Sequence, residues 1–484
     1  MSQKLTLAGL VTCALLQGCA QVNSVVSEVA SLNKAQMNSH TPKNIIMVVS
    51  DGMGPAYTTA YRNFADDPAT PQVDKTIFDR ILMGNASTYP APVSGYVTDS
   101  AAAATALATG VKSYNGAIGV DVNKQPVKSV LHQAKEQGMR TGVAVTSQVV
   151  HATPASYIAH DESRRNYNAI ADDFFDLRFD GKPYANVMIG GGTDFFERED
   201  RDLVAKFIDE GYEYADTYNR LAAIPAGSNV LGLFEPIGLK PVLDDTRKNR
   251  LAYLTQNAIK HLENDNGFFL LVEASQVDWA GHANDIASAM AEMQDLALAL
   301  EYLESYVEQH PDTLVVVTAD HSTGGLTIGA RGDYRWSPEF IQNLKSSVGH
   351  MARTMASGEQ DLTWLASQLG FELTPEETDT LGTLGEDPDA WYIQLKSLID
   401  YRTNTGWTTS GHTGVDVEVF AFGKGREAFL GQMDNTDIAK KIFAMLADKP
   451  AVKTQPKAQQ STTDSSTEKD EDAPCDFKTD WRCQ

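Results

Sequence analysis

Short apolar runs that stop abruptly at polar residues recur along the middle of the chain. They occupy residues 44–50, 141–146, 186–189, 268–272, 314–318 and 417–422. Their hydrophobicity is continuous rather than alternating, which indicates strands buried on both faces, as in a parallel sheet covered by helices. Helix-like stretches lie between them, at residues 101–108, 127–137, 252–262 and 286–308. This alternation predicts an α/β fold with a doubly wound, mostly parallel sheet flanked by helices.

Residues 331–407 interrupt this rhythm of strands and helices. The stretch carries helical segments of its own, and we interpret it as a large inserted surface region on the functional edge of the sheet. The expected organisation is a leader at 1–18, a linker at 19–43, one folded domain at 44–448 that contains the insertion, and a tail at 449–484. The tail is rich in Gln, Ser, Thr and charged residues. It cannot bury enough apolar surface to fold, so we expect disorder there.

The chain is acidic, with 64 Asp and Glu against 40 Lys and Arg and a formal net charge of −24 over 484 residues. Nucleic-acid affinity comes mainly from basic side chains that neutralise phosphates, so this balance argues against a nucleic-acid-binding surface. The four cysteines, Cys13, Cys19, Cys475 and Cys483, all lie near the chain ends. Any metal in the folded body must therefore be held by His, Asp and Glu. Whether Cys475 and Cys483 form a disulfide stays open.

The first residues predict an export signal, with Lys4 ahead of an apolar stretch at 5–16 that is too short for a permanent membrane span. Leu16-Gln17-Gly18-Cys19-Ala20 resembles a bacterial lipobox, with cleavage before Cys19 and lipid attached to its thiol. The alternative is an ordinary secretory peptide cleaved nearby. In either case we expect an exported protein, periplasmic or anchored by lipid at Cys19 in the outer membrane of a Gram-negative bacterium.

Carboxylates and histidines gather at or just after the predicted strand ends, where a doubly wound sheet binds its ligands. The set comprises Asp51, Glu273, Asp278, His282, Asp320 and His321, and His412 adds one more imidazole ahead of the run at 417–422. Each residue alone has an ordinary interpretation as a helix cap, a turn residue or a solvated surface pair. Their joint occurrence predicts a metal site with enough ligands for two zinc ions about 3.5–4 Å apart.

Ser100 directly precedes the Ala-rich helix predicted at 101–108, and it is the candidate nucleophile. Its ordinary interpretation is an N-cap serine. In the functional interpretation, the N–H groups and positive dipole of the helix end favour a phosphate beside Ser100, and a neighbouring zinc lowers the pKa of its hydroxyl. The GxSxG, HExxH and GxxxxGK[ST] motifs are absent from the sequence. We interpret Gly190-Gly191-Gly192 as a turn.

Five motifs give the chain a resemblance to bacterial and animal alkaline phosphatases over residues 44–446, in the order found in that family. They are Ser50-Asp51-Gly52-Met53-Gly54, Thr98-Asp99-Ser100-Ala101-Ala102, Ala152-Thr153-Pro154-Ala155, Thr318-Ala319-Asp320-His321 and Gly411-His412-Thr413. The resemblance implies an alkaline phosphatase-like fold. It also implies hydrolysis of phosphate monoesters to an alcohol and inorganic phosphate, through a phosphoserine at Ser100.

The resemblance further implies two Zn²⁺ and one Mg²⁺. By residue matching, one zinc is held by Asp278, His282 and His412, the second by Asp51, Asp320, His321 and the Ser100 oxygen, and the magnesium by Asp51, Thr153 and Glu273. Arg164 matches the arginine that clamps two phosphate oxygens, with Arg165 as the alternative. Asp99 matches the residue that orients this arginine.

Two residues depart from the best-known enterobacterial enzymes and resemble cold-adapted marine members instead. His151 stands where the enterobacterial enzymes carry Asp, and it either ligates or only neighbours the magnesium. Trp279 stands where they carry Lys, which predicts weaker product binding and a magnesium activation that is easily inhibited. The insertion at 331–407 resembles the large surface loop of the marine group. The family is usually dimeric, so we expect a homodimer.

Two other classes of function are weighed against a monoesterase. A phosphodiesterase, phosphonate hydrolase or sulfatase of the same superfamily typically uses Thr or a modified Cys as nucleophile. Ser100, Arg164 and the pair Glu273 and Thr153 favour the monoesterase. A non-catalytic lipoprotein that binds phosphate or metal is disfavoured by the joint presence of nucleophile, metal ligands and arginine. The physiological monoester is not readable from the sequence.

Overall fold

The computed structural model describes residues 41–447. The predicted leader, the lipidation site at Cys19, the cysteines at 475 and 483 and the predicted tail lie outside the described residues. Among residues 41–447, no helix combines the length and the apolar character that crossing a membrane would require.

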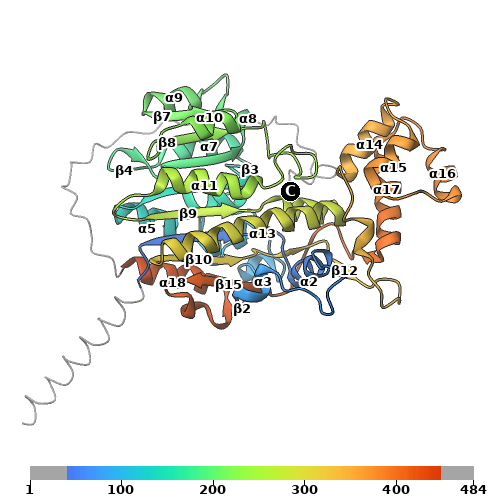
Figure 1. Ribbon diagram of the computed structural model, residues 1–484. Helices are drawn as coiled ribbons and strands as arrows, with labels where there is room; N and C mark the ends of the chain where they lie inside the picture. The colour runs from blue at the N-terminus through green and yellow to red at the C-terminus, as the bar shows by residue number, and fades with distance from the viewer. Residues whose placement is uncertain (1–40, 448–484) are drawn as a thin grey trace, which may run out of the picture.

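A ten-stranded sheet forms the centre of the molecule, in the order β16-β2-β15-β10-β1-β9-β3-β6-β8-β7 (Figure 1). Its strands are β1 (Asn44–Val49), β2 (Leu82–Ser87), β3 (Arg140–Gln148), β6 (Val187–Gly191), β7 (Tyr212–Ala215), β8 (Asn229–Leu233), β9 (Phe268–Glu273), β10 (Thr313–Thr318), β15 (Val417–Gly423) and β16 (Gly431–Asp434). Strand β15 pairs antiparallel with both β10 and β2, and the other pairings of this sheet are parallel. The predicted mostly parallel sheet is confirmed.

The three central strands β1, β9 and β10 are buried along their whole length. Val48 of β1 is paired with Val272 on one side and Val317 on the other. A strand in this position has protein on both faces, so its side chains have almost no contact with solvent. This burial explains the unbroken hydrophobic runs. The end of β1 is therefore flanked directly by the ends of β9 and β10.

Helices cover the sheet and connect its strands. They are α2 (Pro55–Phe64), α3 (Ile77–Ile81), α4 (Ser100–Thr109), α5 (Val130–Glu136), α6 (Ala152–Ile158), α7 (Tyr167–Asp176), α8 (Thr193–Phe196), α9 (Leu203–Asp209), α10 (Tyr218–Ala223), α11 (Arg250–Leu262), α12 (Gln276–His282), α13 (Ile286–Gln309) and α18 (Asn435–Ala447). Helices α11 and α13 pack together in front of the sheet in Figure 1, while α4 packs against α6 and α18. The helix predicted at 127–137 begins later, because the Ser129 hydroxyl caps it by accepting from the backbone N–H of His132 at 3.1 Å.

The insertion folds as a helical group at one end of the sheet (Figure 1). It contains η2 (Pro338–Phe340), α14 (Val348–Ala356), α15 (Leu362–Leu369), α16 (Pro375–Leu381) and α17 (Pro388–Thr403). Met351, Leu365 and Leu395 are fully buried, and α14 packs against α17. At its base, β12 (Thr327–Ile328) pairs with β13 (Thr405–Gly406). A second short ribbon pairs β11 (Ser322–Thr323) with β14 (His412–Thr413), and β4 (Arg178–Phe179) pairs with β5 (Lys182–Pro183) elsewhere.

The interpretation of Gly190-Gly191-Gly192 as a turn is wrong. Gly190 and Gly191 are the last residues of β6, and only Gly192, with a φ of 115°, leaves the strand ahead of α8. A Cβ on Gly191 would lie 1.7 Å from the carbonyl oxygen of Ile237. The glycine is therefore explained by the close approach of the loop at 234–249 to the end of the strand.

Candidate active site

The predicted metal ligands converge at the carboxyl ends of the central strands. Asp51 follows β1, Glu273 is the last residue of β9, and Asp320 and His321 follow β10. Gly52, next to Asp51, has a φ of 75°, and a Cβ there would lie 2.7 Å from the Cα of Asp278. Only a residue without a side chain lets these two ligand-bearing segments approach so closely.

Asp51, Asp320 and His321 form one group, which we call the serine-side group. His321 Nε2 lies 3.3 Å from an oxygen of each carboxylate and 3.1 Å from the Ser100 Oγ. All three ligand side chains are fully buried. Both carboxylate oxygens of Asp51 and Oδ2 of Asp320 have no hydrogen-bond partner within residues 41–447. The alternative of a solvated Asp-His surface pair is wrong.

Asp278, His282 and His412 form a second group, the two-histidine group. The two imidazole Nε2 atoms are 3.1 Å apart, and they lie 3.3 Å (His282) and 3.7 Å (His412) from the Asp278 carboxylate. Each ring donates its Nδ1 proton to a backbone carbonyl, His282 to Ser410 at 2.5 Å and His412 to Thr98 at 2.9 Å. These bonds leave both Nε2 lone pairs facing the carboxylate, the arrangement in which histidine binds metals.

Asp51, His151 and Glu273 form a third group, the glutamate group, which shares Asp51 with the serine-side group. Glu273 Oε1, His151 Nδ1 and the nearby Thr153 Oγ1 are buried without a hydrogen-bond partner in the described part of the chain. The second ring nitrogen, His151 Nε2, lies 3.2 Å from Arg164 Nη2. Buried polar atoms are rarely left unpaired. The carboxylate oxygens of the three groups, the Thr153 hydroxyl and the imidazole nitrogens of the first two groups therefore fit bound divalent metal ions.

Burial and charge act together on the pKa values of these carboxyls. Burial raises the pKa of Asp51 well above its usual value, and the Asp320 carboxylate adds to the effect. Burial raises the pKa of Glu273 to about 7. Burial also opposes ionisation of Asp278, but the neighbouring His282 and other imidazoles lower its pKa overall. Several buried carboxylates close together destabilise the folded chain unless positive charge lies nearby. Divalent cations can supply that positive charge.

Ser100 is the first residue of α4, and the alternative interpretation of Ser100 as the N-cap is wrong. The cap is Asp99, whose Oδ1 accepts from the backbone N–H of Ala102 at 2.9 Å. The Ser100 hydroxyl therefore does not cap the helix, and its Oγ lies within hydrogen-bond distance of His321 Nε2 instead. Every residue of α4 is buried and most are alanine, so the helix packs closely against its neighbours. The small side chains thus fix the position of Ser100.

Arg164 lies beside Asp99 at the start of α4, whereas Arg165 does not. Arg164 is 6% exposed, and its Nη1 lies 3.1 Å from Asp99 Oδ2. The backbone holds this arrangement, because Arg164 N–H donates to the Gly116 carbonyl at 2.7 Å and Gly116 N–H donates to Asp99 Oδ2 at 2.9 Å. Arg165 is exposed. Asp99 therefore both caps α4 and holds the arginine beside Ser100.

Trp279 is buried next to Asp278 on α12, with its ring edge-on to His151 at a centroid distance of 5.9 Å. A Cβ on Gly238 would lie 2.2 Å from the Trp279 ring, so the loop at 234–249 is packed on the tryptophan. The sequence interpretation missed Thr323, whose hydroxyl donates to Asp278 and also lies 3.2 Å from His321 Nδ1. Its only sequence signal is its place two residues after the Asp-His pair.

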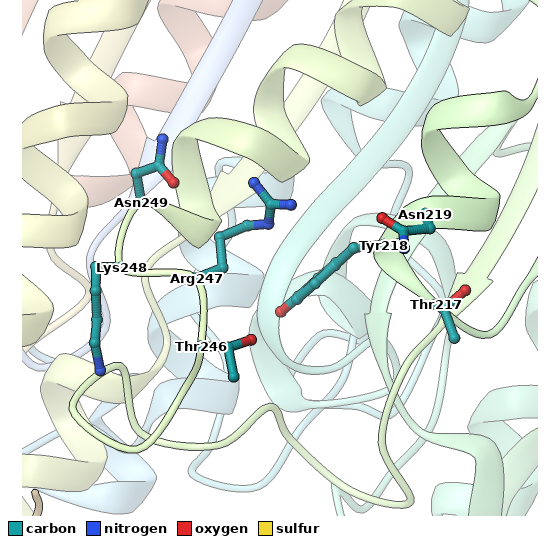
Figure 2. A pocket seen from close by; sticks show the side chains of 7 residues that line it. All are labelled: Thr217, Tyr218, Asn219, Thr246, Arg247, Lys248 and Asn249. Atoms are coloured by element: carbon teal, nitrogen blue, oxygen red, sulfur yellow. The ribbon is translucent and has the colours of Figure 1, made fainter.

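Cavities beside the loop at 234–249 contain none of the predicted site residues. The cavity in Figure 2 has a volume of about 460 Å³ and is lined by Thr217, Tyr218, Asn219, Thr246, Arg247, Lys248 and Asn249. The Arg247 guanidinium lies 4.0 Å from the ring centroid of Tyr253 and 5.3 Å from that of Tyr218. These cation–π contacts explain the position of Arg247 in the cavity wall by packing alone, without a bound ligand. The predicted site at the strand ends is thus separate from this cavity.

Comparisons with known proteins find relatives of one family. The family model described as alkaline phosphatase matches residues 42–447. Alkaline phosphatase 3 of Bacillus subtilis (strain 168) is 44% identical over 428 residues, covering 87% of this chain and 92% of that protein. Alkaline phosphatase of Escherichia coli (strain K12) is 31% identical over 415 residues, covering 74% of this chain and 86% of that protein.

Solved structures are similar over nearly their whole length. A cold-active alkaline phosphatase from the psychrophile Shewanella sp. is 51% identical with a TM-score of 0.79, covering 83% of this chain and 99% of that one. The alkaline phosphatase of the Antarctic bacterium TAB5 is 27% identical with a TM-score of 0.62, covering 84% and 98%. A variant of the TAB5 enzyme, in which Asp replaces a His, is described with magnesium bound in its M3 site.

Proposed function

This chain belongs to the alkaline phosphatase family and is a phosphomonoester hydrolase, and we propose that it works through a phosphoserine at Ser100, beside two zinc ions and one magnesium ion. The observation that carries the proposal is the position of the Ser100 Oγ, 3.1 Å from His321 Nε2 and beside the unpaired oxygens of Asp51 and Asp320. A hydroxyl placed among metal ligands at a helix N-terminus suits attack on phosphorus.

The residues for each ion follow from the three groups. The two-histidine group would hold one zinc, the serine-side group with Ser100 the second, and Asp51, Thr153 and Glu273 the magnesium. When bound, these ions would lower the pKa of the serine hydroxyl and offset charge on the phosphoryl and leaving oxygens. Arg164 can only donate, so the His151 Nε2 that it contacts must accept and the ring proton must lie on Nδ1. This favours His151 as a neighbour of the magnesium and not as its ligand.

The protein groups have distinct roles in the two steps. In the first, the Ser100 oxygen forms a bond to phosphorus while the bond to the alcohol oxygen breaks. In the second, a water oxygen forms a bond to phosphorus while the serine–phosphorus bond breaks, which regenerates the hydroxyl and releases phosphate. Arg164, held by Asp99, binds two phosphoryl oxygens through both steps, a task that suits its planar fork.

The nucleophile assignment is tested with Ser100→Ala. The variant is expected to lose both the burst of alcohol release and covalent phosphate labelling, because no oxygen is left to form the phosphoenzyme. Rapid-quench kinetics with a chromogenic monoester measure the burst. If burst and labelling persist in the variant, the assignment is wrong.

The metal assignment is tested by chelation followed by separate and joint return of Zn²⁺ and Mg²⁺. We expect zinc to restore most activity and magnesium to raise it further, with two zinc and one magnesium per chain by elemental analysis. A zinc content of one, or full activity without zinc, would contradict the assignment.

We also propose that the chain is exported, lipidated at Cys19 and homodimeric, with the folded domain at 44–448 and the insertion at 331–407 as expected from the sequence. Cys19→Ser should move the protein from the membrane fraction to the soluble fraction. Light scattering of the purified protein checks the dimer.

A further inference from the structure

One face of helix α17 in the insertion contacts the segments that carry the two-histidine group. Tyr392, Lys396 and Asp400 are spaced four residues apart, so they lie on the same side of the helix. Tyr392 Oη donates a hydrogen bond to the carbonyl of Ala283, directly after α12, at 2.7 Å. Lys396 Nζ donates to Asn284 Oδ1 at 3.3 Å. This face therefore holds the end of the helix that bears two members of the group.

Asn284 joins the end of α12 to the segment that carries His412. Its backbone has a φ of 51°, in the left-handed region that asparagine tolerates better than most residues. Its Nδ2 donates to the carbonyls of Gly281 and Thr409, each at 2.9 Å. One buried amide, whose oxygen meets Lys396, thus clamps the two ligand-bearing segments together.

Trp407 provides a second link from α17. Its Nε1 donates to Asp400 Oδ1 at 3.1 Å. Its ring packs on Gly324, where a Cβ would lie 2.6 Å from the ring. Gly324 in turn donates its N–H to the carbonyl of Gly411 at 2.9 Å and accepts from the N–H of Thr408 at 3.0 Å. The segment at 408–411, which leads directly into His412, is held by both links.

The orientation of His282 depends on this held segment. His282 Nδ1 donates to the Ser410 carbonyl at 2.5 Å, which directs Nε2 toward Asp278. If the segment at 408–411 moved, the bond that fixes the tautomer and direction of this ring would be lost. Substitution of such outer partners typically lowers metal affinity by about 10- to 100-fold.

We propose that this face of α17, through Tyr392, Asp400 and the clamp residue Asn284, positions the imidazoles of the two-histidine group for metal binding. The inference rests on the proposed function, since it requires that this group holds a zinc ion. The insertion is then a positioning element of the metal site, since none of its described residues belongs to the three ligand groups.

Zinc affinity of the metal-free full chain, measured by competition with a chromophoric chelator, tests the proposal. Asn284→Gly keeps the left-handed backbone accessible but removes the clamp, and Asp400→Ala removes the acceptor for Trp407. Each is expected to weaken zinc binding at the two-histidine group by about 10- to 100-fold. Asp400→Asn keeps an accepting oxygen and should restore the affinity. Tyr401→Phe, on the same helix but 73% exposed, is the matched control and should change nothing.

The two zinc sites are separated by using two parent variants. His321→Ala disables the serine-side group, and His412→Ala disables the two-histidine group. The substitutions on α17 and at Asn284 should lower zinc affinity in the His321→Ala parent only. Unchanged affinity in that parent, or equal losses in both parents, would overturn the proposal. If the His321→Ala parent itself binds no zinc, the proposed function fails, and this inference fails with it.

Circular dichroism of the metal-free proteins checks that each variant folds. Tyr392→Phe removes a single hydroxyl and leaves the packing of its ring intact. If the other substitutions unfold the chain, this variant replaces them. A zinc affinity equal to that of its His321→Ala parent then overturns the proposal, and a loss in that parent alone supports it.

Discussion

The adjacent arginines at 164 and 165 show how backbone hydrogen bonding can place one of two identical side chains in a site and leave the other at the surface. The segment Ser163-Arg164-Arg165 contains no pattern that separates the two side chains. The separation comes from the bond between Arg164 N–H and the Gly116 carbonyl, two residues far apart in the sequence. It buries Arg164 beside Asp99 and leaves Arg165 exposed. The sequence could therefore favour Arg164 only through the family resemblance.

Arg164→Lys should lower kcat/KM by about 10- to 100-fold. A lysine keeps the charge but cannot bind two phosphoryl oxygens in one plane, and a hydrogen bond to a charged group contributes about 1.5–3 kcal/mol. Steady-state kinetics on a phosphate monoester measure the change. Arg165→Lys is the matched control and should retain wild-type kcat/KM. Equal losses in the two variants would contradict the assignment of Arg164.

Trp279→Lys should tighten inhibition by inorganic phosphate by about tenfold, since a cation near the phosphoryl group adds roughly 1.4 kcal/mol or more at short range. The native tryptophan is buried against Gly238 and His151 and contributes no charge. Trp279→Phe separates the loss of the ring from the gain of charge and should leave the inhibition constant near that of the native enzyme. A native inhibition constant already in the low micromolar range would count against this account.

At the scale of single elements, α4 shows which part of the site the sequence predicted and which part it did not. The Ala-rich stretch predicted the helix and placed Ser100 at its start. It could not show that Asp99 is the cap, because Asp and Ser are both good caps and stand next to each other. The outcome depends on Arg164 and Gly116, which bind the other oxygen of the Asp99 carboxylate.

The two roles of Asp99 can be separated by two substitutions. Asp99→Asn keeps an oxygen that can cap Ala102 but places an amide NH2 where Oδ2 accepts from Arg164 and Gly116, so activity should fall while the contribution of the cap to the unfolding free energy is kept. Asp99→Ala loses both and should also cost about 1 kcal/mol of stability. Urea unfolding and kcat/KM together check this. Equal stability losses in the two variants would show that capping is not what distinguishes them.

At the scale of the whole molecule, the buried centre was predictable and the periphery was not. The strands β1, β9 and β10 could be predicted because both of their faces are buried, which gives each an unbroken apolar run in the sequence. Strand β2, with the sequence Leu-Met-Gly-Asn-Ala-Ser, is only partly buried and has no apolar run, so it was missed. The same holds for the short edge strands β7 and β16. The contacts of α17 with α12 join residues more than 100 positions apart, and no local pattern reports them.

A buried charge cluster joins helix α11, helix α13 and the loop at 234–249. Arg250 is fully buried and lies 2.6 Å from Glu292 and 3.3 Å from Asp295. Glu292 also accepts from the N–H of Val242 at 2.8 Å, and Asp295 from that of Leu251 at 3.1 Å. The cluster contains one cation and two carboxyls. Burial raises the pKa of Asp295 to about 7, against the opposing effect of Arg250.

This cluster should make the stability of the molecule depend on pH. The pKa of Asp295 is about 7 in the folded chain and near 3.8 when unfolded, so between these values the folded state binds the extra proton. Stability from this group is therefore present in full near pH 4 and is lost as pH rises through 7. Asp295→Asn removes the titration while its amide oxygen can still accept from Leu251. The difference in unfolding free energy between variant and native protein, both metal-free, should move in favour of the variant from pH 4 to pH 8. Glu308→Gln, an exposed substitution on the same helix that leaves the cluster intact, is the control. A flat difference for Asp295→Asn would mean that Asp295 remains ionised throughout this range.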